Sequence, residues 1–348
     1  MIGVLASGRD YCQEVYRAWN GFWFTPKDPA TLSLLRLLAG AMLFYTHLVW
    51  SLDLSAFLGP HGWLPVEYLR SEVQVQGAQG MQVPIWSVWS IFFWIQSTWL
   101  LWCVHLFALT IFFCLMIGLF SRTTAVLGYL LAVSYAQRVS PGAFFGLDKV
   151  NVMLAMYLML GPCGARYSLD RLVRLRRSQQ APLGGKGPIE STPKKQTSPA
   201  ASTSANIAIR LIQIHLCVIY LFAGMAKLEG ANWQAGTAVW WAVANLEYQS
   251  LNMTWLARWP MLVALATHLT VFWEASYCFL VWNRYTRPLV LWMAMFVHTG
   301  IALAMGLMTF GLAMIIANLS FLSPATVRRW VDPLAARFSL LLVGKQVG

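Results

Sequence analysis

The chain has 348 residues, of which 58% are apolar and 11% are charged, and its mean hydropathy is +0.57. A soluble domain carries roughly a quarter charged residues, so this composition excludes an ordinary soluble protein and indicates a polytopic integral membrane protein. The net charge of +12 is explained by a basic cytoplasmic face lying against anionic lipid. The expected partner is therefore the lipid bilayer, and no nucleic acid is needed to account for the charge.

A helix needs about 20 mostly apolar residues to cross a bilayer, and about eight stretches of differing length approach that requirement. They are residues 32–52, 99–120, 124–136, 150–160, 207–226, 261–282, 289–304 and 307–322. The third and fourth are short, so they either tilt, pair as re-entrant segments or begin earlier than drawn. We therefore expect an all-α fold, a polytopic transmembrane helical bundle of about eight spans.

Two further stretches, residues 84–94 and 237–248, are rich in tryptophan and serine. Tryptophan gathers at the membrane interface because its ring is apolar while its N–H seeks water. These two stretches are predicted to be helices that lie on the membrane surface.

The loops divide the chain into two membrane halves. Basic residues are concentrated between Arg166 and Arg210, which places that side in the cytoplasm by the positive-inside rule, together with both termini. From Ser178 to Asn206 the sequence has almost no large apolar side chains and is predicted to be a disordered linker. The expected divisions are an N-terminal cytoplasmic segment, a first membrane half, a basic linker, a second membrane half and a cytoplasmic tail: residues 1–30, 31–165, 166–206, 207–323 and 324–348.

The cysteine pattern and the N-terminus exclude two common features. The six cysteines form no C-x-x-C pair and fall mostly inside apolar runs, so neither a zinc site nor a disulfide framework is expected. The opening "MIGVLASGRDYCQEV" contains no adequate apolar core for a cleavable signal peptide. The first span is therefore expected to act as the targeting signal.

Ionisable residues inside the spans are the main candidates for function, because a charge in the membrane is costly. Glu274 lies near the middle of "HLTVFWEASYCFLVW" with no adjacent base, so it must be protonated, paired or exposed to water in a cavity. His268 lies nearly opposite it on the helix, so any partner must come from another helix. His298 is placed similarly within its own span.

Lys227 ends the apolar run of "YLFAGMAKLEGANW". It is either an anchor that snorkels into the headgroups, with Glu229 as a surface partner, or a buried base.

The order of several motifs resembles the HTTM family, the horizontally transferred transmembrane domain relatives of the vitamin K-dependent gamma-carboxylase. The matching segments are "WNGFWFTPKDPATLSLLRLLAGAMLFYTHLVWSLDLSAFLGPHGWLP", "MLGPCGARYSLDR" and "IYLFAGMAKLEGANWQAG". A looser match then follows, consisting of Glu274 in "VFWEASYCFLVW", Arg287 with Pro288, His298, Phe310 and Met314. The resemblance covers most of the chain, from Trp19 to Pro324.

The resemblance implies a membrane enzyme of the lyase class that uses reduced vitamin K or another naphthoquinol and no metal. In the carboxylase, the segment similar to "YLFAGMAKLEGANW" carries two consecutive lysines, and the second is the base that deprotonates the quinol. That second lysine falls on Lys227 and the first on Ala226. The implied catalytic residues are Lys227, Glu274 and His298, and Arg287 with Trp233 is expected to contact the quinol.

Two departures from the carboxylase bear on this reading. An Asn-His pair of the carboxylase falls in the segment that here reads "LDKVN", so its histidine has no counterpart and Asp148 or Lys149 occupies that neighbourhood. This weakens the implication of the carboxylation step. The chain is also about half as long as the animal enzyme and lacks its large extramembrane domain.

Two alternatives to the quinol-dependent enzyme stay open. One is a maturation or export factor for a secreted peptide or lipoprotein, which would make an exported peptide or protein the partner. The other is a non-catalytic membrane scaffold or transporter in which Lys227 is only an anchor. The distribution of the family indicates a bacterial inner membrane.

Overall fold

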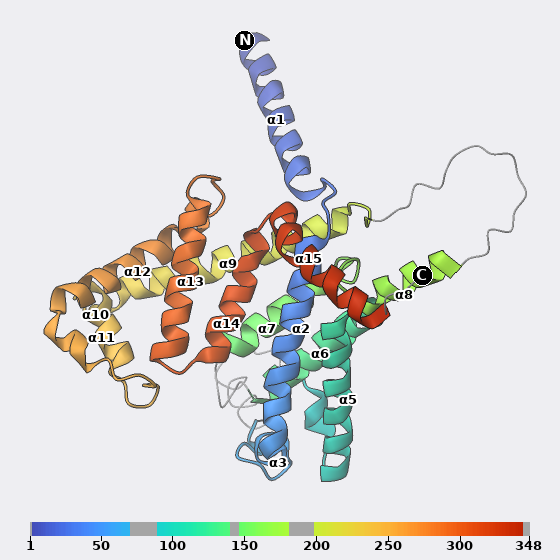
Figure 1. The fold of residues 1–348 in the computed structure, drawn as a ribbon. Helices are drawn as coiled ribbons and strands as arrows, with labels where there is room; N and C mark the ends of the chain where they lie inside the picture. The colour runs from blue at the N-terminus through green and yellow to red at the C-terminus, as the bar shows by residue number, and fades with distance from the viewer. Residues whose placement is uncertain (1, 70–88, 140–145, 181–197, 344–348) are drawn as a thin grey trace, which may run out of the picture.

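The computed structural model describes residues 2–69, 89–139, 146–180 and 198–343. In these ranges the chain is all-α, and extended backbone pairs only between Lys27 and Ser202. The expected all-α fold class is therefore confirmed. Helix α1 (Ile2–Trp23) projects away from the bundle formed by the other long helices (Figure 1).

The first half of the bundle follows α1. Its elements are α2 (Ala30–Trp50), η1 (Ser51–Asp53), α3 (Leu54–Leu58), η3 (Ile91–Trp94), α5 (Thr98–Ile117), α6 (Ser121–Val139), α7 (Gly146–Leu158) and α8 (Leu169–Gln180).

The second half of the bundle begins with the longest helix of the described chain. Its elements are α9 (Thr203–Glu229), α10 (Ala231–Gln234), α11 (Ala238–Val243), η4 (Thr254–Arg258), α12 (Pro260–Leu280), α13 (Arg287–Ala304), α14 (Met308–Asn318), η5 (Leu319–Phe321) and α15 (Pro324–Val343).

Five helices of the described chain are long and apolar enough to cross a membrane, which is fewer than the eight expected. They are α5, α9, α12, α13 and the segment that joins α2 to α3. A sixth span results if the sharply bent pair of α14 with η5 and α15, which turns by 117°, counts as one. The protein is therefore an integral membrane protein with five long apolar helices and several shorter ones.

The two short expected spans are helices, but neither passes as an independent span. Helix α6 carries Arg122 and Arg138 in its 19 residues, which lowers its hydropathy. Helix α7 has only 13 residues, which at 1.5 Å per residue gives about 20 Å, less than the hydrocarbon thickness of about 30 Å.

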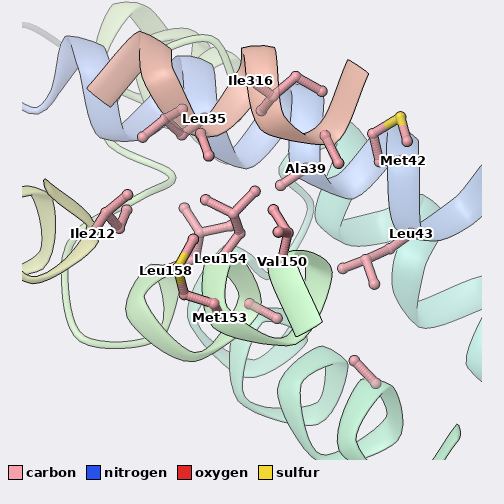
Figure 2. Close-up of a cluster of buried hydrophobic side chains, with 14 of the residues drawn as sticks. Leu35, Ala39, Met42, Leu43, Val150, Met153, Leu154, Leu158, Ile212 and Ile316 are labelled. Carbon is pink, nitrogen blue, oxygen red and sulfur yellow. The ribbon is translucent and has the colours of Figure 1, made fainter. Parts of the chain in front are cut away.

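Helix α7 occupies the centre of the bundle instead. It packs against α2, α6, α9 and α14. Figure 2 shows Val150, Met153, Leu154 and Leu158 of α7 facing Leu35 and its neighbours on α2, Ile212 on α9 and Ile316 on α14. A short helix surrounded on several sides by apolar partners is stabilised by packing rather than by contact with lipid.

Arg36 of α2 is a charged side chain inside the bundle that forms no ion pair with a described residue. Its side chain is fully buried, and Nη1 donates to the carbonyls of Leu115 and Met116 at 2.7 and 2.8 Å. These carbonyls belong to the last turn of α5, where a helix leaves its C=O groups without intrahelical partners. Gly118 ends α5 in the left-handed conformation (φ 73°), and a Cβ at this position would lie 2.6 Å from Arg36 Nη1. The arginine therefore caps the end of a neighbouring helix.

Asp170 of α8 caps the start of α6, the helix that follows α5. Its carboxylate accepts hydrogen bonds from the backbone N–H groups of Phe120 and Ser121, each at 2.8 Å, and from the Ser121 hydroxyl at 2.7 Å. The segment that follows the first membrane half is therefore held against the α5–α6 turn.

Parts of the expected linker and surface segments are ordered helices. Within residues 166–206, α8 is helical and α9 already begins at Thr203, while residues 181–197 lie outside the described ranges. The predicted surface helix at 84–94 is described only from residue 89 and contains the η3 turn, and the one at 237–248 contains the short helix α11. The C-terminal tail contains α15.

Candidate functional site

The candidate site lies where α9 and α12 come into closest contact. In Figure 1 the two helices run side by side and cross the direction of α2 and α14. At Gly224 a Cβ would lie 2.7 Å from the backbone N and 2.9 Å from the Cα of Ala275, so only glycine permits this approach. Lys227 follows Gly224 by one turn, and Glu274 precedes Ala275. The glycine therefore brings the lysine and the glutamate to the same level of the helix pair.

Lys227 and Glu274 form an ion pair, with Nζ of the lysine 2.5 Å from Oε2 of the glutamate. The lysine side chain is 23% exposed and the glutamate side chain 9%. The Trp233 ring also approaches the ammonium, with its centroid 5.2 Å from Nζ, at a distance typical of a cation–π contact. Of the options that the sequence leaves open for Glu274, the structure shows a partner from another helix. Glu229, which the sequence offers as a surface partner for Lys227, is exposed and forms no ion pair with that lysine.

His298 of α13 joins the site through Tyr220, which lies two turns before Lys227 on α9. The Tyr220 hydroxyl and His298 Nε2 are 2.7 Å apart, and Asn318 Nδ2 of α14 donates to the same hydroxyl at 2.9 Å. The Tyr277 hydroxyl of α12 donates to Asn318 Oδ1 at 2.6 Å. Four helices therefore supply one buried polar network directly beside the ion pair.

Two buried polar atoms at this site have no hydrogen-bond partner among the described residues. One is Nδ1 of His298. The other is Oε2 of Glu274, which has the Lys227 ammonium as its close neighbour but accepts no bond of good geometry. Buried polar groups are normally paired, so the unpartnered Nδ1 of His298 marks a place where a polar ligand atom would be favoured, whereas Glu274 Oε2 already has the Lys227 ammonium at 2.5 Å.

Aromatic side chains surround Tyr220 and His298 on several sides. Trp273 lies 5.0 Å from Tyr220 and 6.2 Å from His298 between ring centroids, and Phe310 lies 6.1 Å from His298. Phe310 also meets Gly146 at the start of α7, where a Cβ would lie 2.7 Å from its ring. The start of α7, which carries Asp148 and Lys149, thus adjoins Phe310.

Arg287 lies elsewhere in the second half. Its Nε and Nη2 donate to the carbonyls of Val281 and Trp282 at 2.9 Å each, so it caps the end of α12 at the start of α13. This end lies beyond Tyr277, on the side of the network away from Lys227. The structure therefore brings together Lys227, Glu274, His298 and Trp233, and it does not bring Arg287 to them.

Tyr220, Tyr277 and Asn318 are the members of the network that sequence reasoning missed. Tyr220 and Lys227 are seven residues apart, which places them on one helix face. Asn318 is a lone amide in an otherwise apolar run, which is a signal for an interhelical hydrogen bond in a membrane. The identity of its partners required the three-dimensional structure.

The described residues hold no cluster of three or more metal-ligating side chains. Two open hollows of the described chain lie along α1 between Tyr11 and Trp19 and at the loop of residues 249–254. The candidate site is a mostly buried polar cluster in which Lys227 is partly exposed.

No protein-family model, curated protein or solved structure matches this chain.

Proposed function

We propose that this integral membrane protein is an enzyme of the HTTM type that removes a proton from a lipid-soluble quinol, with Lys227 as the base. The observation that carries the proposal is the Lys227–Glu274 ion pair beside the Tyr220–His298 hydrogen bond. A charged pair inside a membrane is costly, and such residues usually serve proton transfer or ligand binding.

The ion pair gives Lys227 a route to the neutral form that a base requires. Transfer of the ammonium proton to the Glu274 carboxylate leaves a neutral amine and a neutral acid, which removes the cost of burying two charges. The amine then accepts a proton from a ligand hydroxyl placed within hydrogen-bond reach of Nζ. Glu274 would thus store one proton while Lys227 takes another.

The residues present fit an aromatic ligand that carries hydroxyl groups. The unpaired Nδ1 of His298 would bind one polar atom of the ligand, and the rings of Trp233 and Trp273 would contact its apolar body. When bound, a quinol supplies an acidic hydroxyl and, in the carboxylase that the sequence resembles, the strong base that acts on a glutamate. Access from the lipid side of Lys227 suits a molecule dissolved in the membrane.

The orientation forms part of the same proposal. Asp28 before α2 contacts Arg166 after α7 and Arg328 of α15, and Lys27 pairs with Ser202 before α9. These junctions therefore share one end of the bundle, which is rich in arginine. The positive-inside rule assigns that end to the cytoplasm, most simply of a bacterial inner membrane, and the Lys227 end to the outside.

Turnover of a reduced naphthoquinone by protein in nanodiscs, supplied with oxygen and bicarbonate, tests the proposal. We expect the wild type to form quinone epoxide, and Lys227→Ala to form none. Lys227→Arg is the sharper variant, because it keeps a cation for Glu274 but a guanidinium does not lose its proton at neutral pH. It should also be inactive. Glu229→Gln, two residues away and exposed, is the matched control and should remain active.

Two results would overturn the proposal. One is the absence of epoxide with folded wild-type protein, and the other is full activity in Lys227→Arg. The second result would favour a structural role, in which the ion pair holds α9 against α12 and any cation serves.

A further inference from the structure

A second group of polar side chains lies at the opposite end of α9 from Lys227. Arg210, in the second turn of α9, is half-buried against two aromatic rings that contact each other, with its guanidinium 4.1 Å from the Phe22 ring and 5.6 Å from the Trp282 ring. Its Nη1 donates to Gln213 Oε1 at 3.0 Å, whereas its buried Nε has no partner in the described chain. This arginine is therefore held in place by aromatic contacts and has an unused donor.

Arg287 adjoins the same tryptophan. It donates through Nη2 to the Trp282 carbonyl at 2.9 Å and through Nε to the Val281 carbonyl. The two guanidinium groups thus contact one residue from different helices, and neither forms an ion pair with a described residue. Two like charges held close together without a counter-ion repel each other, which an anion would relieve.

Lys27 supplies the third charge. Its backbone pairs with Ser202, which is the N-cap of α9, through bonds of 2.9 and 3.1 Å. Ser202 directly precedes α9, so Lys27 lies at the end of that helix that carries Arg210. Burial, together with the positive charges of Arg210 and Arg287, also lowers the pKa of Lys27. The adjacent acid does not neutralise this lysine by an ion pair, because Asp28 binds Arg166 at 2.8 Å and contacts Arg328 at 3.6 Å.

We infer that Lys27, Arg210 and Arg287 form a binding site for a phosphate group at the membrane face where α9 and α13 begin. Planar guanidinium groups match phosphate oxygens in geometry, and a lysine adds a flexible point charge. The phosphate belongs either to the headgroup of an anionic lipid or to a free phosphate ion. The Phe22 and Trp282 rings give the site an apolar wall, which suits a lipid whose headgroup lies at the interface. This site is independent of Lys227 and of the proposed quinol chemistry.

Binding of phosphatidylglycerol, phosphatidylcholine and inorganic phosphate to the detergent-purified full chain tests the inference. Native mass spectrometry counts the bound lipid, and the melting temperature reports stabilisation by either anion. We expect phosphatidylglycerol to bind wild type more tightly than phosphatidylcholine. Lys27→Gln and Arg210→Gln should each weaken this binding by about tenfold, the loss typical of one charge-assisted hydrogen bond.

Arg284→Gln is the matched control. Arg284 lies near Arg287, is exposed and stacks on Tyr285 instead, so its loss should leave the binding unchanged. Lys27→Gln keeps the backbone pairing with Ser202, so this variant is expected to fold. Equal stabilisation by inorganic phosphate and phosphatidylglycerol would identify a free-phosphate site, and stabilisation by the lipid alone a headgroup site. Equal lipid binding in all three variants, or no preference for either anion in wild type, would overturn the inference.

Discussion

Lys227 and Glu274 come from helices that are far apart in sequence, yet their charged atoms lie 2.5 Å apart inside the second half of the bundle. The pair depends on Gly224, where α9 and α12 make backbone contact. Its two members differ in surroundings, because the glutamate is nearly buried while the lysine is partly exposed. This asymmetry determines how the protein should respond when either partner is removed.

Lys227→Met is expected to lower the free energy of unfolding by about 3 kcal/mol, because it leaves the Glu274 carboxylate buried without its partner. Glu274→Leu should cost less, since the lysine side chain can extend from its partly exposed position toward the headgroups. The double variant should recover most of the loss, because an apolar pair of similar volume often replaces a buried ion pair without penalty.

Unfolding of the three variants in detergent measures this coupling as a double-mutant cycle. If the two single losses simply add in the double variant, the ion pair is not energetically coupled. Quinol turnover, by contrast, should stay absent in the double variant even where stability returns. The same set of variants therefore separates the structural role of the pair from its proposed catalytic role.

Tyr220→Phe should destabilise the protein by about 1 to 3 kcal/mol, because it leaves His298 Nε2 and Asn318 Nδ2 buried with one bond fewer. The thermal midpoint of the purified variant measures this loss. Tyr45→Phe is the control, because Tyr45 is 54% exposed and its loss should have little effect. Equal midpoints for both variants would show that the network does not contribute to stability.

Gly224→Ala is expected to separate α9 from α12, because the added methyl group would meet backbone atoms of Ala275 that cannot move aside. We expect a loss of about 1 to 3 kcal/mol, the usual cost of overpacking, and reduced quinol turnover. Gly300→Ala is a matched control in α13, where a Cβ would meet nothing within 4 Å. That variant should be neutral or more stable by about 0.5 to 1 kcal/mol, since alanine favours a helix over glycine. An unchanged Gly224→Ala variant would mean that the helices do not need this contact.

The sequence predicts the fold class and the ionisable residues that lie inside the spans, because both follow from local composition. Apolar runs of sufficient length identify α2, α5, α9, α12 and α13 as spans. The position of Glu274 inside such a run already requires that any ion-pair partner come from another helix. Neither inference needs knowledge of how the helices pack.

The span count and the identity of the partners depend on packing. Helix α7 is too short to span alone, but its neighbours on several sides make it the central helix (Figure 2). The sequence of α7 shows only a short apolar run, which does not reveal its central position. Arg36 caps α5 and Arg287 caps α12, and both arrangements use backbone carbonyls of other segments, which carry no sequence signature.

The Asp170 cap makes part of the stability of α6 depend on pH. Partial burial opposes ionisation of Asp170, but the hydrogen bonds from Ser121 and Phe120 and the charge of Arg174 outweigh it and lower the pKa below the usual 3.8. The unfolded chain therefore binds this proton at a higher pH than the folded protein does. The stabilisation is fully present above the unfolded value of 3.8 and is lost as the pH falls through the lower folded value.

Asp170→Asn should remove this contribution. The variant is expected to be about 1 kcal/mol less stable near neutral pH, as for loss of a helix N-cap. The difference from wild type should shrink on acidification, because protonation of the wild-type carboxyl group abolishes the same charged cap. Melting temperatures of both proteins, recorded from about pH 7 down to about pH 3, measure this convergence. A constant difference over that range would mean that the negative charge of Asp170 does not stabilise the start of α6. The loss in the variant would then come only from the poorer hydrogen bonds of the asparagine amide.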